Sequence, residues 1–301
     1  FSPDGQTIAS ASRDQTVKLW QPDGRLLTTL IGHSDMVTAV AFSPVSPAGT
    51  LSAERTLRER ERVASPQGFG NTIATASDDS TVKLWKRDGS LLQTLNGHTQ
   101  EVWGVAFSPD GQTIASASRD NTVKLWKRDG SLLQTLKGHS DGVKAVAFSP
   151  QGNIIATGSE DNTVKLWKRD GSLLRTLNGH NGAVWGIAFS PNGKMIASAS
   201  DDQTVKLWNP DGTLLTTLNG SHNGAVWGVA FSADGQTIAS ASEDRTVILW
   251  NLKHILSLDK LQSYSCAWVS DYLRTNVDVH ESVSVAPVQE TQRLCDGIKL
   301  Q

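Results

Sequence analysis

The pentapeptide Thr122-Val123-Lys124-Leu125-Trp126 decides the fold, because it recurs at a regular interval along the chain. Identical Thr-Val-Lys-Leu-Trp segments end at Trp20, Trp85, Trp126, Trp167 and Trp208, and a Thr-Val-Ile-Leu-Trp variant ends at Trp250. The segments from Trp85 to Trp208 follow one another at a constant interval, whereas Ser221 lengthens the last interval and an insertion lengthens the first. A constant period of roughly 40 residues is typical of repeat architectures.

Each unit of this repeat predicts four short strands joined by tight turns. In the unit of Trp126, apolar-rich stretches cover residues 101–107, 112–118, 122–127 and 131–136, and Ser-Pro-Asp-Gly, Arg-Asp-Asn and Arg-Asp-Gly turns separate them. We name these strands a, b, c and d in chain order, and we expect them to form an antiparallel meander. Because one small sheet cannot bury both of its faces, the units are expected to stack around an axis as the blades of a β-propeller.

Composition and charge exclude several classes of protein. The 301 residues carry a formal net charge of -2, without the basic excess of most nucleic-acid binders and polybasic membrane binders. Cys266 and Cys295 provide neither a disulfide framework nor the spacing of a metal site. No apolar run reaches the roughly 18 residues of a membrane span, and the first residues lack a signal-peptide pattern. We therefore expect a cytoplasmic protein without cofactor, metal or membrane contact, and a chain cut from a longer one, because Phe1 is not an initiator methionine.

The repeat resembles the WD-40 family at three places in each unit. In the unit of Trp126 these are Gly97-His98 at the head, the Ser-x-Asp-x-Thr segment at 118–122, and Leu-Trp at the end of the third strand. The resemblance covers about residues 1–252, although the Asp that usually follows the Trp is replaced, for example by Lys127. It agrees with an all-β fold, a β-propeller of four-stranded antiparallel blades with six visible repeats.

The resemblance also implies a hydrogen-bonded tetrad of His, Ser or Thr, Asp and Trp in each blade. The complete tetrads are His98, Ser116, Asp120 and Trp126; His139, Thr157, Asp161 and Trp167; His180, Ser198, Asp202 and Trp208; and His222, Ser240, Asp244 and Trp250. His33 is expected to join Thr75, Asp79 and Trp85, while the first unit keeps Ser10, Asp14 and Trp20 without a His. Because the trio of hydroxyl, His and Asp recurs beside a Trp in unit after unit, we interpret it as a structural network. Without a phosphate loop, a metal cluster or an unrepeated catalytic trio, the chain is not expected to be an enzyme.

The strand pattern leaves both ends of the array incomplete. The first unit supplies strands b to d, the next four supply a to d, and the last supplies a to c, which makes 22 strands. The simplest interpretation is truncation of an array of seven or more blades, and the alternative is a six-bladed ring completed by the tail. Residues 45–68 form an insertion between strands a and b of the second unit, and their mixed charge predicts a solvated loop, with a docking arm as the alternative.

Residues 253–301 form a C-terminal extension of different composition. Apolar residues at helical spacing predict an amphipathic helix over about 258–274. The Cys-x-Trp, Asp-Tyr-Leu and Arg-Leu-Cys-Asp segments resemble the extension of bacterial, especially cyanobacterial, WD-repeat proteins. That resemblance implies a propeller that follows a kinase, NTPase or peptidase domain in a larger protein.

Antiparallel order places the b–c turns and d–a loops of every blade at one end, here called the upper end, and the a–b and c–d turns at the lower end. The residue before each tetrad Asp then lies at the upper end: Arg13, Asp78, Arg119, Glu160, Asp201 and Glu243. Lys-Arg pairs occupy three successive c–d turns of the lower end, at residues 86–87, 127–128 and 168–169. We interpret the pairs as a solubilising rim, with phosphate or nucleic-acid contact as the alternative.

Strand a carries an unusual position five residues after the tetrad His, occupied by Trp103, Trp185 and Trp227 in three units and by Thr38 and Lys144 in two. Two interpretations stay open: the indoles fill space between blades, or they form an exposed aromatic patch with an acidic fringe. The WD-40 resemblance implies that this neighbourhood contacts partners. The candidate partner-binding residues are Glu101, Trp103, Lys144, Trp185, Trp227, Arg119, Glu160, Asp201 and Glu243.

These observations favour a protein-interaction scaffold or docking module that binds protein or peptide ligands. We expect it to be the C-terminal sensor or assembly part of a larger bacterial signalling or regulatory protein, so that an upstream effector domain of the same polypeptide is a second expected partner. The alternative is binding of nucleic acid or another anionic polymer through the basic lower rim, which the overall charge does not favour.

Overall fold

The computed structural model describes residues 1–44, 72–253 and 255. The predicted insertion at 45–68 and the predicted helix at 258–274 lie outside these residues. The chain divides into two compact units, Phe1–Gly235 with Ala239–Ile248, and Gln236–Ile238 with Leu249–Gln301. All of the candidate partner-binding residues belong to the first of these, which we call the larger unit.

Within the described residues, 22 strands form six sheets. The first sheet contains β1 (Ile8–Ala11), β2 (Thr16–Trp20) and β3 (Leu26–Ile31). Four sheets of four strands follow: β4 (Val37–Phe42), β5 (Thr72–Ser77), β6 (Val82–Lys86) and β7 (Leu91–Leu95); β8 (Val102–Phe107), β9 (Thr113–Ser118), β10 (Thr122–Lys127) and β11 (Leu132–Lys137); β12 (Val143–Phe148), β13 (Ile154–Ser159), β14 (Val164–Lys168) and β15 (Leu173–Leu177); β16 (Val184–Phe189), β17 (Ile196–Ser200), β18 (Val205–Trp208) and β19 (Leu214–Leu218). The last sheet contains β20 (Val226–Phe231), β21 (Thr237–Ser242) and β22 (Val247–Asn251).

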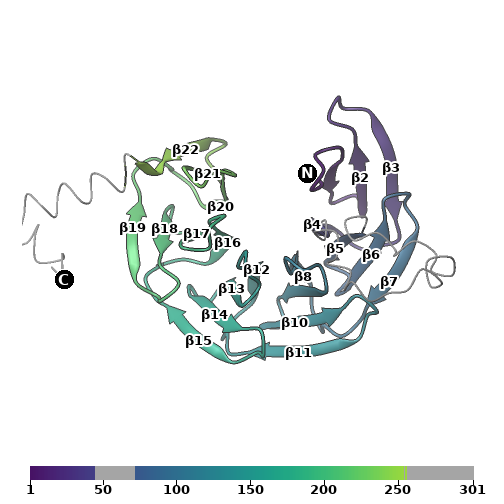
Figure 1. Cartoon of the computed structure of the whole chain (residues 1–301), viewed down its shortest axis with the longest axis horizontal. Coiled ribbons are helices and arrows are strands. Elements are labelled where there is room, and N and C mark those ends of the chain that lie inside the picture. The colour runs from purple at the N-terminus through teal and green to yellow at the C-terminus, as the bar shows by residue number, and fades with distance from the viewer. Residues whose placement is uncertain (45–71, 254, 256–301) are drawn as a thin grey trace, which may run out of the picture. The chain divides into compact units, whose positions relative to one another are not determined.

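Strands pair in chain order within each sheet, so β8 to β11 form the antiparallel meander that the repeat predicts. In the larger unit the first strands of successive sheets lie against one another, β4 on β8, β8 on β12 and β12 on β16. Figure 1 shows these first strands on the inner side of the larger unit and β7, β11 and β15 on its outer side. Apart from residues 252, 253 and 255, which are helical, the regular secondary structure of the described residues is all-β, as expected for a propeller of four-stranded blades.

The hydrophobic core lies between adjacent sheets. One buried cluster joins Val123 and Leu125 of β10 to Ile155 and Trp167 of the next sheet, and three further clusters combine neighbouring sheets in the same way. Trp85, Trp126, Trp167 and Trp208 therefore each pack on the sheet before their own. The four from Trp85 to Trp208 are at most 2% exposed, which explains why the pentapeptide that ends in Trp recurs.

A β-bulge interrupts the pairing between the first two strands of each complete sheet. In the sheet of β8 and β9, Val102 pairs with Ser118 and Gly104 with Ala117, so Trp103 has no partner. The same shift in the other complete sheets leaves Thr38, Lys144 and Trp185 without a partner. A bulge bends the strand and redirects the side chain of the extra residue. The position singled out in the sequence is therefore a bulge position.

Candidate functional site

The structure brings together the members of the predicted tetrads. In five sheets the His Nδ1 atom lies 2.7–2.9 Å from an Asp oxygen, and the His Nε2 atom lies 2.7–2.8 Å from a Ser or Thr hydroxyl oxygen. The indole nitrogen of Trp85, Trp126, Trp167 and Trp208 donates to that same hydroxyl oxygen over 2.8–2.9 Å. Trp250, the indole of the fifth tetrad, belongs to the smaller unit, Gln236–Ile238 with Leu249–Gln301.

The direction of these hydrogen bonds follows from the groups involved. An indole N–H can only donate and an ionised carboxylate can only accept. Trp126 therefore donates to Ser116, the Ser116 hydroxyl donates to His98 Nε2, and the His98 Nδ1–H donates to Asp120. Every group is satisfied when the imidazole is neutral. The Ser116 side chain is fully buried, and its hydroxyl is engaged on both sides.

The tetrad carboxylates are held in their ionised form. Burial raises the pKa of Asp120, but hydrogen bonds from His98 and Thr122 outweigh it and keep that pKa well below its usual range. The carboxylate accepts from the backbone N–H and hydroxyl of Thr122 and from the backbone N–H of Thr99. In the second sheet, burial lowers the pKa of His33, although Asp79 opposes the shift, so the neutral imidazole of His33 is favoured.

The tetrads hold the upper end in one conformation. In each b–c turn the residue after the tetrad Asp has a φ of 65–69°; these residues are Gln15, Ser80, Asn121, Asn162, Gln203 and Arg245. The Asp side chain spans this residue by accepting a hydrogen bond from the backbone N–H of the Thr that follows it. The backbone N–H before that Asp donates to the d–a loop, for example from Arg119 to the carbonyl of Glu101 over 2.9 Å. Turns and loops of the upper end are thus bonded together, as antiparallel order predicts.

Lys144 lies at the centre of the candidate partner-binding residues. Its ammonium nitrogen is 3.2 Å from the centre of the Trp103 ring and 4.2 Å from the centre of the Trp185 ring. A Glu160 carboxylate oxygen lies 2.8 Å from the same nitrogen, and the Lys144 side chain is 8% exposed. The lysine therefore joins three successive sheets through two cation–π contacts and one ion pair.

The three indoles differ in exposure. Trp103 and Trp185 are half-buried because Lys144 lies between them, and the Trp185 indole N–H also donates to Asp201. Trp227 is 52% exposed. Each of the two interpretations left open by the sequence thus describes some of the three indoles, and the Lys144 ammonium group contacts Trp103, Trp185 and Glu160 within the protein.

The remaining charged residues of the upper end are engaged to different degrees. Arg119 and Glu101 form an ion pair of 2.9 Å with both side chains partly exposed. One carboxylate oxygen of Asp78 is buried and accepts no hydrogen bond. Burial, together with the nearby charges of Asp35 and Glu101, raises the pKa of Asp78.

At the lower end, the arginines of the three Lys-Arg pairs bridge adjacent sheets. Arg87 pairs with Asp4 over 2.7 Å and Arg169 with Asp110 over 2.8 Å, while Arg128 donates to the Thr72 hydroxyl. The lysines of the pairs are exposed at residues 86, 127 and 168. The arginines therefore connect sheets, and the lysines supply the free positive charge of the rim.

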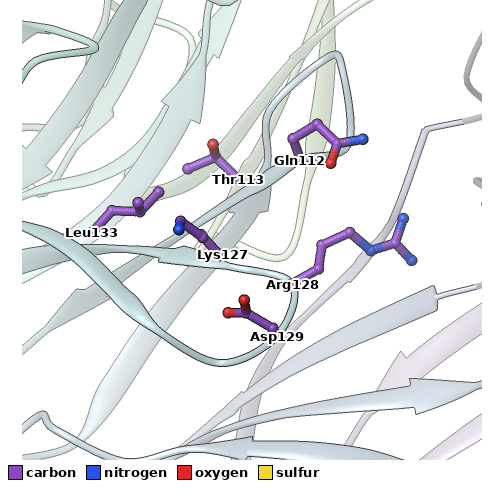
Figure 2. Close-up of a pocket in the computed structure, with 6 residues that line it drawn as sticks. All are labelled: Gln112, Thr113, Lys127, Arg128, Asp129 and Leu133. Atoms are coloured by element: carbon purple, nitrogen blue, oxygen red, sulfur yellow. The ribbon is translucent and has the colours of Figure 1, made fainter.

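A pocket of about 420 Å³ opens at the lower end of the third sheet. Its lining residues are Gln112, Thr113, Lys127, Arg128, Asp129 and Leu133. Figure 2 shows the Lys127 and Arg128 side chains pointing in different directions. Because the charges that line it are mixed and do not converge, this pocket does not resemble an anion-binding site.

Within the described residues no group of three or more His, Cys, Asp or Glu is placed to hold a metal ion, and no helix there has the length and apolar character to cross a membrane.

Sequence reasoning missed the contact of Lys144 with two indoles. A regular strand directs successive side chains to opposite faces, whereas the bulge gives this position its own direction. The sequence did contain a signal for this contact, because Trp103, Lys144 and Trp185 occupy the same position in three successive repeats. Equivalent places on adjacent sheets are neighbours in space.

Comparison with known sequences agrees with this geometry. A family profile described as "WD domain, G-beta repeat" matches residues 1–21, 24–53, 63–86, 89–127, 130–168, 171–209 and 212–251. Seven matched segments and six sheets are compatible, because 24–53 includes β3 and β4 while 63–86 includes β5 and β6. These two segments are the halves of one repeat, separated at the inserted residues.

Curated relatives match over part of the array. The nuclear distribution protein PAC1-1 of Uncinocarpus reesii is 36% identical over 109 residues, which cover 36% of this chain and 24% of the relative. The nuclear distribution protein nudF of Aspergillus niger is 34% identical over 109 residues, with the same shares of both chains. PAC1 of Arthroderma benhamiae is 37% identical over 110 residues, 36% of this chain and 20% of the relative. The chain thus spans about a quarter or less of these relatives, all of them fungal, and they give no support to the bacterial resemblance.

Proposed function

The chain belongs to the WD40 repeat family, and from that premise we propose that it is a protein-interaction scaffold whose upper end binds a protein or peptide partner. One observation carries the proposal: buried tetrads fix the turns of the upper end, while the bulges place aromatic and charged side chains in a row across it. A rigid surface with aromatic anchors loses little entropy on binding.

We propose no catalytic role for the tetrads. A nucleophile needs access to substrate, whereas the hydroxyls of Ser116, Thr157 and Ser198 are fully buried between a His and a Trp. A cytoplasmic location and an effector domain elsewhere in the polypeptide are further parts of the proposal. The bacterial setting rests on the C-terminal extension alone. The nuclear distribution role in the names of the fungal relatives is not carried over, because the match covers 24% or less of their length.

Photo-crosslinking from matched positions tests the scaffold role. Gln100 and Lys127 are exposed at opposite ends of the third sheet, so a benzophenone amino acid at either position leaves the core unchanged. In extract of the native host, we expect a protein adduct from position 100 and none from position 127. An adduct from position 127 alone, or none from either, would contradict the proposal.

A second candidate function is binding of an anionic polymer at the lower end. The observation in its favour is the series of exposed lysines at 86, 127 and 168. The bridging arginines reduce the charge available there. Phosphate-like contacts predict retention on heparin that fades between about 50 and 200 mM salt and disappears in a triple Lys→Gln variant.

A further inference from the structure

Lys144 provides an internal example of how this upper end binds a cation. Its nitrogen contacts the Trp103 and Trp185 rings and pairs with Glu160, which lies in the b–c turn of the same sheet. Close approach of the first strands makes this possible. A side chain at Gly104 would meet the backbone of Lys144 at 3.0 Å, so the two strands are adjacent at this point.

The last sheet carries an indole and a carboxylate at the positions that correspond to Lys144 and Glu160. Trp227 is the second residue of β20, as Lys144 is of β12 and Trp185 of β16, and Glu243 follows it at the same spacing at which Glu160 follows Lys144 and Asp201 follows Trp185. The Glu243 backbone N–H donates to the carbonyl of Ala225 over 2.9 Å, so its turn lies against the loop that leads into β20. In the preceding sheet, side chains with this spacing are in contact, since Trp185 donates to Asp201.

Trp227 and Glu243 are both accessible. Trp227 is 52% exposed, and Glu243 is exposed as well. No hydrogen bond or ion pair within the described residues engages the Glu243 carboxylate or the Trp227 indole N–H, whereas Glu160 is paired with Lys144. An exposed indole face and an unpaired carboxylate are each complementary to an ammonium or guanidinium group.

We propose that Trp227 and Glu243 form a binding site for a lysine or arginine side chain of a protein partner. The cation would lie over the indole and pair with the carboxylate, the two kinds of contact that Lys144 makes with Trp185 of the next sheet and Glu160 of its own. This inference rests on the proposed function, because it names the side chain that the upper end receives. Charge complementarity favours a basic segment over an apolar one, since Glu243 would be left without a partner by an apolar side chain.

The test uses the whole chain and a fluorescein-labelled peptide of alternating lysine and glycine. A second peptide carries acetyl-lysine, which keeps the stem and loses the charge. We expect the lysine peptide to bind and to change tryptophan fluorescence, and the acetylated peptide to bind much more weakly. Trp227→Leu should weaken binding about fivefold, Trp227→Phe less, and Glu243→Gln about threefold.

Ile31→Ala is the matched control, because Ile31 is 75% exposed in the first sheet and its truncation removes apolar surface without an aromatic face. It should bind the lysine peptide like the wild type. Thermal unfolding checks that Trp227→Leu folds, as expected for an exposed side chain. The inference is overturned if the lysine peptide does not bind, if the acetylated peptide binds equally well, or if Trp227→Leu leaves affinity unchanged.

The two proposals fail in different ways. If position 100 yields a protein adduct and the Trp227→Leu and Glu243→Gln variants yield it equally, the scaffold role stands and the cation site is overturned. If the lysine peptide binds in a manner that depends on Trp227 and neither position yields an adduct, the scaffold role is contradicted while the cation-binding site at Trp227 and Glu243 is supported.

Discussion

The ammonium nitrogen of Lys144 lies 3.2 Å from the centre of the Trp103 ring, although the two residues come from adjacent sheets. Both occupy bulge positions, where the residue has no partner in the neighbouring strand. Their contact couples the upper ends of two blades at a point where the first strands are adjacent, since a Cβ atom at Gly104 would lie 3.0 Å from the Lys144 backbone. A local irregularity of the strand therefore creates a contact between repeats.

Replacing Lys144 by Met tests the energy of this contact. The variant keeps an unbranched side chain but removes the charge, so Glu160 loses its partner and two indoles lose a cation. We expect a loss of about 1–3 kcal/mol in the free energy of unfolding, measured with urea. Acrylamide should also quench tryptophan fluorescence more strongly.

Lys168→Met is the control for that experiment, because Lys168 is exposed at the lower end. It should change the free energy of unfolding by less than about 0.5 kcal/mol. Equal urea midpoints for the Lys144 and Lys168 variants would show that the cation–π contacts contribute nothing measurable.

Gly142 is predicted to be required for the position of the Trp103 indole. A Cβ atom at Gly142 would lie 2.7 Å from a carbon of the Trp103 ring and 2.7 Å from a Glu160 oxygen. Gly142→Ala should therefore displace Trp103 from Lys144 and cost about 1–3 kcal/mol of unfolding free energy. Gly228→Ala is the matched control, because its Cβ atom would meet nothing within 4 Å. Similar stability of the two variants would contradict the prediction.

The strands could be predicted from the sequence because the signals are local and repeated. The stretch at 122–127 is β10, and the stretch at 101–107 differs from β8 by one residue. Turn residues, the alternation of apolar side chains and the recurring Trp all point to the same strand boundaries in each repeat. The 22 strands and the incomplete first and last sheets follow from the same pattern.

The candidate site was predicted less completely, because its geometry depends on neighbours from other repeats. The sequence identified Trp103, Lys144 and Trp185 as equivalent, but it could not show that the ammonium group lies between the rings. That arrangement requires the bulge and the close approach of the first strands, which no single repeat encodes. The exposure of Trp227 likewise depends on what lies beside β20.

Stability is predicted to fall in acid through the tetrad carboxylates. The pKa of Asp120 in the folded chain is well below its usual value of 3.8, so the unfolded chain binds a proton that the folded chain does not. The contribution of Asp120 is therefore fully present above about pH 5 and decreases as the pH falls below about 4. Asp161 and Asp202 shift in the same direction. Urea midpoints at pH 7, 5 and 3.5 should decline, and Asp120→Asn should start lower and decline less; parallel declines would contradict the assignment.

Removing a tetrad His is predicted to destabilise the fold. The His139 side chain is 1% exposed and joins Asp161 to the Thr157 hydroxyl, so His139→Ala leaves a small cavity and an unpaired donor. Asp161 still accepts from the backbone N–H of Ser140 over 3.1 Å, and Thr157 can turn toward the carbonyl of Lys165, 3.3 Å away. These remaining partners limit the expected loss to about 1–3 kcal/mol of unfolding free energy, measured with urea.

A double-mutant cycle distinguishes a network from independent contacts. If His139 and Asp161 act together, His139→Ala combined with Asp161→Asn should cost less than the sum of the two single losses, because the second substitution breaks a hydrogen bond that the first has already removed. Additive losses would mean that each residue stabilises the turn alone, and an unchanged melting temperature for His139→Ala would contradict the structural role of His139.

The equivalent substitution, His98→Ala, should give a loss of similar size in the neighbouring blade. His98 lies 2.7 Å from its Asp oxygen and 2.8 Å from its hydroxyl oxygen, and His139 lies 2.7 Å from both of its partners. Agreement between the two blades is the outcome that a repeated structural network requires and that a single functional site does not.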